Sequence, residues 1–540
     1  MSIETVLRYH EETKHGFFRY APGPRTMDWA NQPDPFRRYA GAPLVRLPIL
    51  PPDESPRYEA LYQPGAIAQA PLEVRTLSRF FEYALALSAW KQAGELRWAL
   101  RSNPSSGNLH PTEGYIVADA MAGLAALPAL YHYAPKEHAL ELRAELRPEG
   151  FALLMQAFPP GAFLLGFSSV NWRETWKYGE RAFRYCQHDV GHALGAARFA
   201  ARALGWRMRL LDGSSDDTIA SLLGIDRDAD FAGVEREHPD CLAVVWPGDA
   251  AVRLPAAVSL PQAFSPRRWH GSANRLSRDT PVRWPLLAEV EAASWKATTE
   301  HALIALQTQP PSNAVGGGLS AGQVIRQRRS ALAFDGKTSI AAAGFFAMLG
   351  RVMPRGMPFD VLAWAPAIDL ALFVHRVDGL APGLYVLARD PASTGALRAA
   401  THPHFAWTPP PGCPGDLPLF LLQEGDAREL AAQLSCRQEI AGDGAFSLGM
   451  IAQFEPRLRR HGAWFYRRLF WEAGLIGQVL YLEAEAAGVR ATGIGCFFDD
   501  PVHDVLGFKD KAFQSLYHFT TGAPVDDPRL TTLPAYAIPG

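Results

Sequence analysis

Cysteine is scarce in this chain. Five cysteines occur among 540 residues, and no two of them stand at the C-x-x-C spacing of zinc ribbons and dithiol motifs. An odd number of unpatterned cysteines is not typical of a disulfide framework or a structural zinc site. We therefore expect reduced thiols in a cytoplasmic protein, at Cys186, Cys241, Cys413, Cys436 and Cys496.

Long apolar runs and a strong net charge are also lacking. No stretch of about 18 uninterrupted apolar residues occurs, which argues against a membrane span. The first ten residues, MSIETVLRYH, show no basic-then-apolar signal pattern. The formal net charge is −2, so neither nucleic acid nor an anionic membrane surface is an expected partner.

The common nucleotide and hydrolase motifs are missing as well. There is no G-x-G-x-x-G after a strand, no Walker loop and no G-x-S-x-G. A Rossmann-type nicotinamide domain is therefore not expected. If NAD(P)H is used, it would have to bind transiently over another cofactor.

The most informative feature that is present is an internal repeat. A shift of 283 positions (for example from Arg184 to Arg467) aligns matching residues without a gap. The matches are Gly179 with Gly462, Arg184 with Arg467, Gly191 with Gly474, Ala201 with Ala484, Gly205 with Gly488, Asp216-Asp217 with Asp499-Asp500, and Leu223-Gly224 with Leu506-Gly507. One fixed offset over this length predicts a tandem duplication of one α+β domain, which also suits a chain too long for a single core.

Local patterns predict the elements of the first copy and the domain limits. We expect helices at 74–91, 173–204 and 215–223, strands near 115–118, 163–167, 206–211 and 242–246, and a hairpin around 135–137. Residues 1–65 are predicted to be an arm packed on the body, with a flexible tail as the alternative. Domain one then spans 66–250, a linker with one helix near 286–304 spans 251–318, and domain two spans 319–540.

A polar loop follows the first predicted helix. Residues 104–111 read Pro-Ser-Ser-Gly-Asn-Leu-His-Pro, a composition that favours turns. Such a loop offers backbone N–H groups, hydroxyls and amides in a small space, which suits a polar ring-shaped ligand. The alternative is an ordinary surface turn.

This loop resembles the Pro-Ser-Ser/Ala-x-Asn element of the nitroreductase superfamily, and most closely that of SagB/ThcOx-type flavin-dependent azoline dehydrogenases. The run Tyr9-His-Glu-Glu-Thr-Lys-His15 resembles the leader of SagB-like proteins. The resemblance implies two nitroreductase-like domains and the cofactor FMN. In that superfamily the loop of one subunit reaches the flavin held by the other, so a duplicated chain is expected to form an intramolecular pseudo-dimer.

The second copy carries the remaining parts that the resemblance implies. A helix capped by Ser320 is expected to present Arg326, Arg328, Arg329 and Ser330 to the FMN phosphate and ribityl chain, and arginine can bond phosphate oxygens in two places. A solvated basic face is the alternative. The strand end Gly493-Ile494-Gly495 resembles the segment beside the flavin ring, and Arg529 is a weaker phosphate candidate. Since the first copy keeps the loop, with Pro104, Ser105, Ser106 and Asn108, and the second keeps these parts, we expect one composite FMN site per chain and a degenerate second site.

The catalytic candidates are Lys177 and Tyr178. The run Trp176-Lys-Tyr-Gly-Glu-Arg-Ala-Phe-Arg-Tyr185 resembles the Lys-Tyr element of azoline dehydrogenases, whose pair is the acid/base. Azoline oxidation removes a hydride and a neighbouring proton, and a desolvated lysine could accept that proton. The alternative is a surface lysine beside a packing tyrosine. His188 and His192 are spaced like metal ligands, but no third ligand is placed, so no metal is expected.

Three functions remain open at this point. The first is an FMN-dependent SagB-type dehydrogenase acting on azoline-like rings of a modified peptide or a related small molecule. The second is an NAD(P)H-dependent nitro- or quinone reductase, and the third is an inactive scaffold that binds a peptide or partner. Beyond the pseudo-dimer, further homo-oligomerisation is left open.

Overall fold

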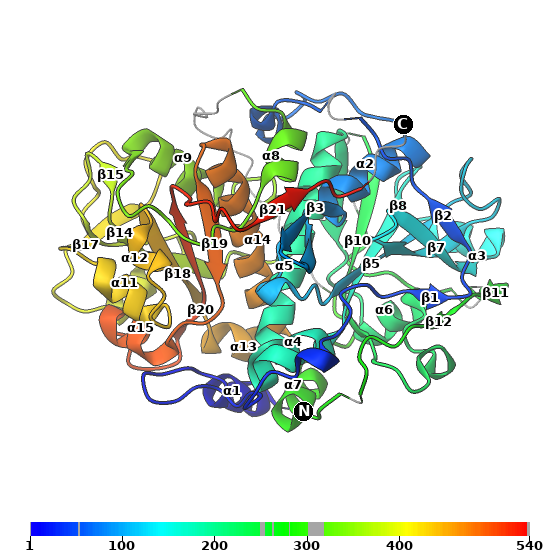
Figure 1. The fold of residues 1–540 in the computed structure, drawn as a ribbon, viewed down its shortest axis with the longest axis horizontal. Helices are drawn as coiled ribbons and strands as arrows, with labels where there is room; N and C mark the ends of the chain where they lie inside the picture. Colours follow the sequence, from blue (N-terminus) through cyan, green and yellow to red (C-terminus); the bar gives the residue numbers. More distant parts are fainter. Residues whose placement is uncertain are drawn as a thin grey trace.

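The computed structural model describes residues 2–51, 55–248, 254–261, 264–279, 281–300 and 318–536. Two β-sheets lie on either side of a central pair of long helices, α5 (Ala182–Ala203) and α14 (Phe465–Ala486), as Figure 1 shows. Every residue of α5 is buried, and α14 is buried from Phe465 to Ala484. The fold is thus a mixture of helix and sheet around one helical centre.

The two large sheets have the same strand order. The first runs β7-β6-β5-β8-β10-β9, extended by β11 and β2 beside β7, and the second runs β17-β16-β14-β18-β20-β19. All neighbouring strands in both are antiparallel. In both sheets the first long strand is central and fully buried, because apolar residues occupy both of its faces.

The strands of the first sheet are β2 (Leu44–Arg46), β5 (Thr112–Ala118), β6 (Ala129–Ala134), β7 (Ala139–Glu145), β8 (Phe163–Ser169), β9 (Trp206–Leu210), β10 (His238–Pro247) and β11 (Arg268–Trp269). Those of the second are β14 (Ile368–Val374), β16 (Gly383–Leu387), β17 (Leu419–Glu424), β18 (Phe446–Gln453), β19 (Arg490–Ile494) and β20 (Phe513–Gly522). The remaining helices are α1 (Ile3–Glu12), α2 (Val74–Ala84), α3 (Pro148–Met155), α4 (Asn171–Tyr178), α6 (Asp216–Leu223), α7 (Pro285–Ala293), α8 (Ala321–Gln327), α9 (Ala342–Arg351), α10 (Thr394–Ala400), α11 (Arg428–Leu434), α12 (Ile440–Asp443), α13 (Glu455–His461) and α15 (Asp499–Leu506).

The contacts between the halves are reciprocal. A Cβ at Gly191 of α5 would lie 2.8 Å from the Cα of Gly474 on α14, and a Cβ at Gly474 would lie 2.9 Å from the Cα of Gly191. Arg184 pairs with Asp499 at 2.8 Å, and Arg467 pairs with Asp216 at 2.5 Å. These partners are the residues that the 283-position shift aligns. The two ion pairs therefore join corresponding positions of the two aligned segments.

Replacing Gly191 by alanine is expected to disrupt this helix crossing. The added methyl group would meet the Trp471 carbonyl and Gly474 backbone, which cannot turn aside like a side chain, so we expect a loss of about 1–3 kcal/mol or more in unfolding free energy. Gly344→Ala in α9 is the matched control, because no atom lies within 4 Å of a Cβ there. Urea denaturation of both variants measures the difference, and equal stabilities would contradict the close packing.

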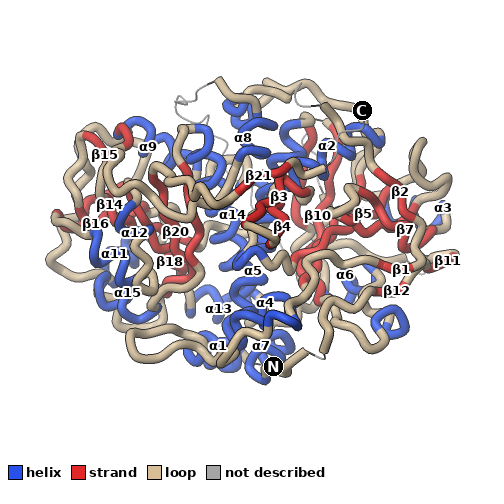
Figure 2. Tube along the Cα trace, viewed as in Figure 1, coloured by secondary structure: helices blue, strands red, loops and turns tan. Residues whose placement is uncertain are grey.

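Both ends of the described chain cross between the halves. His10 of α1 hydrogen-bonds Tyr466 at 3.2 Å, and Lys14 pairs with Asp500 at 2.7 Å. At the other end, β21 (Thr531–Leu533) pairs with β3 (Leu87–Ala93), which pairs with β4 (Leu96–Arg101). Figures 1 and 2 show this small sheet between the two large ones. The tail of the second half therefore completes a sheet of the first.

Several predicted elements match, and four differ. The helix expected at 74–91 ends at Ala84, and residues 87–93 form strand β3 instead, which pairs with β4 and β21. The strands of the first sheet, the hairpin β6–β7 and α6, which Ser215 caps through Thr218 N at 3.1 Å, lie where expected. The helix expected at 173–204 is broken at Gly179, where φ is +56° and a Cβ would lie 2.5 Å from the Pro22 carbonyl oxygen. The N-terminal arm crosses at that point, and only glycine leaves it room.

The other two differences concern helix ends. The linker helix α7 ends at Ala293 rather than near 304, and residues 301–304 lie outside the described part. Helix α8 has its predicted Ser320 cap but ends at Gln327, so Arg328, Arg329 and Ser330 follow it in an extended segment. That segment leaves the helix because it pairs with β19, where Ser330 bridges Ala491. The linker also contributes β11 to the first sheet.

Candidate active site

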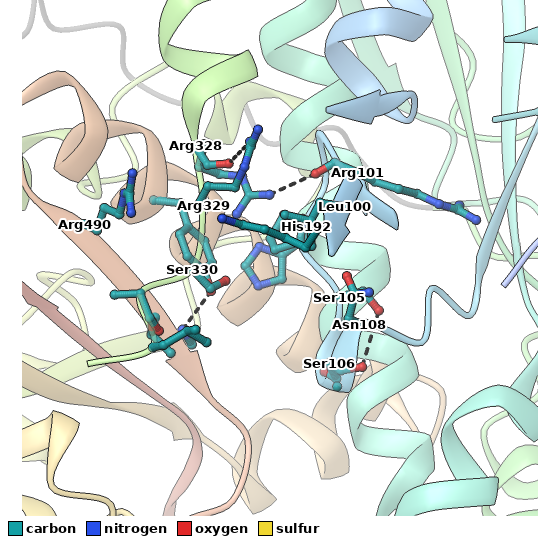
Figure 3. A pocket seen from close by; sticks show the side chains of 18 of the residues that line it. Leu100, Arg101, Ser105, Ser106, Asn108, His192, Arg328, Arg329, Ser330 and Arg490 are labelled. Atoms are coloured by element: carbon teal, nitrogen blue, oxygen red, sulfur yellow. Dashed lines mark hydrogen bonds between the residues drawn. The ribbon is translucent and has the colours of Figure 1, made fainter. Parts of the chain in front are cut away.

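A large cavity of about 970 Å³ opens between the two halves. The first half contributes β3, β4 and the loop 103–110, and the second contributes residues 326–332, β19 and the tail 525–532. Figure 3 shows Ser105, Ser106 and Asn108 on one side of the cavity, and Arg328, Arg329, Ser330 and Arg490 on the other. The predicted loop and basic segment therefore meet, although more than two hundred residues separate them in the sequence.

The polar loop is held from below by an acid of helix α5. Asp189 accepts hydrogen bonds from the backbone N–H of Ser106 at 3.0 Å and from its hydroxyl at 3.1 Å. Burial raises the pKa of Asp189 to about 7, and these hydrogen bonds oppose that rise. Gly107 and Asn108 both have a positive φ, so the loop is a tight turn rather than a strand extension. Some polar groups of the loop are thus used in hydrogen bonds that fix the conformation of the loop.

Other polar groups of the loop are also hydrogen-bonded within the protein. Ser105 Oγ accepts from His110 N at 2.8 Å, and Asn108 Nδ2 donates to the Ala99 carbonyl at 2.8 Å. The Ser105 hydroxyl also interacts with the Asp189 carboxyl, and it lies 3.5 Å from the Ser106 carbonyl oxygen. Pro104 also lines the cavity. Ser105, Ser106 and Asn108 line it too, so all four predicted loop residues border the cavity.

Positive charge is concentrated at the second-half end of the cavity. Arg328 donates to the Arg101 carbonyl at 2.9 Å, and Arg329 donates to the Ser88 hydroxyl at 3.3 Å. Burial, and then the charge of Arg328, lower the pKa of Arg329 to about 10. Burial, and then Arg329 and Arg490, also lower the pKa of Lys91. Arg329 and Lys91 therefore lie among other cations, and an anion such as a phosphate would stabilise such a cluster.

Lys91 and Arg490 were not predicted as site residues. Arg490 opens the glycine-containing strand, so its position next to the predicted motif is a usable signal. Lys91 lies on β3, and nothing in its local sequence marks it. Only the pairing of β21 with β3 brings the tail of the second half against this lysine.

The glycine strand is packed against tyrosines of the protein. A Cβ at Gly493 would overlap the Tyr517 hydroxyl, and a Cβ at Gly495 would overlap the ring of Tyr185. Tyr481 ties the strand to the basic segment, since its hydroxyl accepts from Gly493 N at 2.9 Å and hydrogen-bonds Ser330 Oγ at 2.8 Å. Ile494 lines the same wall. These glycines are therefore required first by the protein's own rings, which the sequence did not indicate.

Of the two catalytic candidates, only Tyr178 lines the cavity. Lys177 lies behind it, half-buried, with its ammonium nitrogen 5.3 Å from the centre of the Tyr178 ring. Both side chains reach the underside of the loop: a Cβ at Gly107 would lie 2.6 Å from the Tyr178 oxygen and 3.2 Å from the Lys177 nitrogen. Burial, and then Glu174, raise the pKa of Tyr178 well above its usual value, so its phenol keeps its proton.

Glu174 is a further acid that the sequence did not indicate. It lies one turn before Lys177 on α4, and its carboxyl oxygens have no hydrogen-bond partner among the described residues. Burial, and then Asp189, raise its pKa well above the ordinary value. The charge of Lys177 opposes this rise in the pKa of Glu174, so the two residues influence one another electrostatically.

The structure does not bring every predicted residue to the cavity wall. Arg529 is exposed and bonded to Asp527 at 2.7 Å, and it does not line the cavity. Arg326 lines it while paired with Glu82 at 3.1 Å. His188 stacks on Tyr517, and His192 hydrogen-bonds the Tyr517 hydroxyl at 3.1 Å. The described residues contain no cluster of three or more side chains suited to a metal ion.

The cavity has unsatisfied polar atoms that fit a polar cofactor. Asn103 Oδ1, His110 Nδ1 and Arg328 Nε are buried beside it and have no partner among the described residues. Together with the cation cluster, they provide donors and acceptors for a ring with polar edges and for a phosphate. In the part of the chain that the structure describes, no helix has the length and apolarity needed to cross a membrane.

Parts of this chain are similar to known proteins in sequence or in structure. Residues 89–234 match the model of the nitroreductase family. A "putative nitroreductase" of Methanocaldococcus jannaschii is 27% identical over 160 residues, which cover 29% of this chain and 76% of that protein. The crystal structure of a "putative nitroreductase" from Anabaena variabilis superposes with a TM-score of 0.69 and 22% identity, covering 96% of this chain and 99% of that one. A chain of the Escherichia coli microcin synthetase complex aligns with 17% identity and a TM-score of 0.27, over 45% of this chain and 80% of that one.

Proposed function

Because this protein is an oxidoreductase that carries a nitroreductase-family domain at residues 89–234, we propose that it uses FMN, bound once per chain in the cavity between its halves. The observation that carries the proposal is the meeting of the loop 104–108, the segment 328–330 and the strand end 493–495 in one cavity. The phosphate is assigned to Arg328 and Arg329, with Lys91 and Arg490 alongside, and the ring to the space between Ser105 and Gly493–Gly495.

We also infer that the chain is an intramolecular pseudo-dimer of two nitroreductase-like domains, at 66–250 and 319–540. The common strand order and the reciprocal pairs Arg184–Asp499 and Arg467–Asp216 support this. Strand β2 of the arm and strand β11 of the linker both pair with β7 and so extend the first sheet.

A single site follows from an asymmetry at matched positions. On the cavity side, the Tyr185 hydroxyl donates to the Gly495 carbonyl at 3.2 Å. The 283-position shift maps these residues onto Arg468 and Asp212, which form a buried ion pair at 2.7 Å. A buried pair of charged side chains thus occupies the place where the second site would begin.

The reaction we propose is the oxidation of an azoline-like ring, in a modified peptide or a related small molecule. When bound, FMN would accept the hydride. The chain's own residues handle the proton: the Tyr178 hydroxyl faces the cavity, and Lys177 behind it receives the proton that leaves the neighbouring ring atom. The loop 104–108 covers this corner and keeps water from it.

Flavin stoichiometry tests the proposal. Purified protein saturated with FMN should hold one flavin per chain, measured by absorbance after denaturation against protein concentration. Two equally occupied sites, or a protein that takes up no flavin, would contradict it. Steady-state assays then separate the reactions: rapid NAD(P)H oxidation with a nitroarene or quinone, without turnover of azoline peptides, would favour the reductase alternative. A protein inactive in both assays would favour a scaffold.

A further inference from the structure

Two of the five cysteines meet beside the cavity, although they are far apart in the sequence. Cys496 lines the cavity directly after Gly495, and Cys436 lies just beyond helix α11. Both are partly exposed, and their side chains lie close enough to influence one another electrostatically. The flavin chemistry proposed above gives neither of them a role.

The two cysteine-bearing segments are tied together by their neighbours. The Gln438 side-chain amide donates to the Ser435 carbonyl at 2.8 Å and to the Cys496 carbonyl at 3.1 Å. Phe498 N also donates to the Leu434 carbonyl at 2.8 Å. Cys436 and Arg437 both have left-handed backbones, with φ of +55° and +61°. L-residues adopt this conformation at an energetic cost, and such strain concentrates at functional sites.

A histidine of the N-terminal arm faces Cys496. His15 Nδ1 accepts the backbone N–H of Ala21 at 2.8 Å, so the hydrogen of the neutral ring lies on Nε2. The His15 side chain interacts with Cys496, and this interaction lowers the pKa of the Cys496 thiol. Burial lowers the pKa of His15, which keeps the ring neutral. The Arg181 guanidinium, which reaches the Gly495 carbonyl at 3.4 Å, adds positive charge nearby.

The pKa values of the two thiols are shifted in opposite directions. The hydrogen bond from Cys436, and then those from His15, lower the pKa of Cys496 to about 5 against the opposing effect of burial. The same contact with Cys496 raises the pKa of Cys436. One sulfur is then a nucleophile, and the other is a thiol held in contact with it. Burial instead raises the pKa of the other three thiols, Cys186, Cys241 and Cys413.

We propose that Cys436 and Cys496 are a redox-active pair that closes to a disulfide by exchange with a low-molecular-mass disulfide admitted through the cavity. The Cys496 thiolate attacks one sulfur of the incoming disulfide, whose S–S bond breaks and releases one thiolate. The Cys436 thiol then loses its proton to solvent and attacks the Cys496 sulfur, which expels the second thiolate. Two protein thiols are oxidised and one external disulfide is reduced to two thiols, so electrons balance.

The test uses the full-length protein and glutathione disulfide. After exposure, the intact mass should fall by two hydrogen atoms, a peptide linking Cys436 to Cys496 should appear, and dithiothreitol should reverse both. In Cys436→Ser the reaction should stop at a stable glutathione adduct on Cys496. Cys413→Ser is the matched control, because Cys413 is also partly exposed, and it should behave as the parent protein.

A second measurement needs no variant of the pair. Near neutral pH, iodoacetamide should alkylate Cys496 on the order of tenfold faster than Cys413, because only the thiolate reacts and an ordinary thiol is a few per cent ionised there. Equal alkylation rates, or glutathione adducts without a Cys436–Cys496 link, would overturn the proposal. Neither result requires flavin: both are measured on protein without added FMN, so their failure leaves the FMN proposal intact.

Discussion

Lys177→Ala should yield a protein that keeps its flavin and oxidises substrate about 10²–10⁴-fold more slowly, the loss typical of removing a general base. The alanine takes away the amine that reaches the underside of the loop beside Tyr178, and it leaves the cation cluster untouched. Stopped-flow reduction of bound flavin by an azoline peptide measures the step directly, because it separates proton and hydride removal from later turnover.

Two companion variants make this result specific. Tyr178→Phe keeps the ring and removes the hydroxyl that lines the cavity, so it should also slow flavin reduction while the flavin stays bound. Lys337→Ala removes an exposed lysine distant in the fold, on the loop after Asp335, and should leave the rate unchanged. Loss of flavin in Lys177→Ala, or an unchanged rate, would remove Lys177 from the proposed proton path.

Arg329→Ala is expected to weaken FMN binding about ten- to a hundredfold. A charge-assisted hydrogen bond is worth roughly 1.5–3 kcal/mol, which corresponds to that range of affinity. Equilibrium dialysis or fluorescence titration of apoprotein with FMN gives the dissociation constant. Riboflavin, which lacks the phosphate, should bind the parent and the variant with equal affinity if Arg329 contacts the phosphate.

The control for this variant is Arg459→Ala, an exposed arginine that pairs with Glu455 on α13. It removes the same charge outside the cavity and should leave the dissociation constant unchanged. If Arg329→Ala binds FMN as tightly as the parent while Lys177→Ala loses it, the assignment of phosphate and proton roles is reversed. The two variants should thus affect different quantities: Arg329→Ala lowers the affinity for FMN, and Lys177→Ala lowers the rate of substrate oxidation.

Much of the local structure was available from the sequence. Ser320 caps the helix that it was expected to cap, because a serine side chain satisfies free N–H groups at a helix start wherever the helix lies. The repeat at 283 positions aligned Arg184 with Arg467 and Asp216 with Asp499 before any contact was known. Periodicity and caps depend on neighbouring residues, and a repeat depends on one constant shift. These features can therefore be recognised from the sequence alone.

Only the tertiary structure determined which residues line the cavity and what they pack against. Lys91 becomes a site residue because β21 pairs with β3, and Gly493 and Gly495 are glycines because Tyr517 and Tyr185 press on them. The break at Gly179 depends on the arm at Pro22, and the partners of Cys496 come from three distant segments. Each of these features is a contact between residues far apart in the chain. The local sequence around a residue does not identify the distant residue that will pack against it.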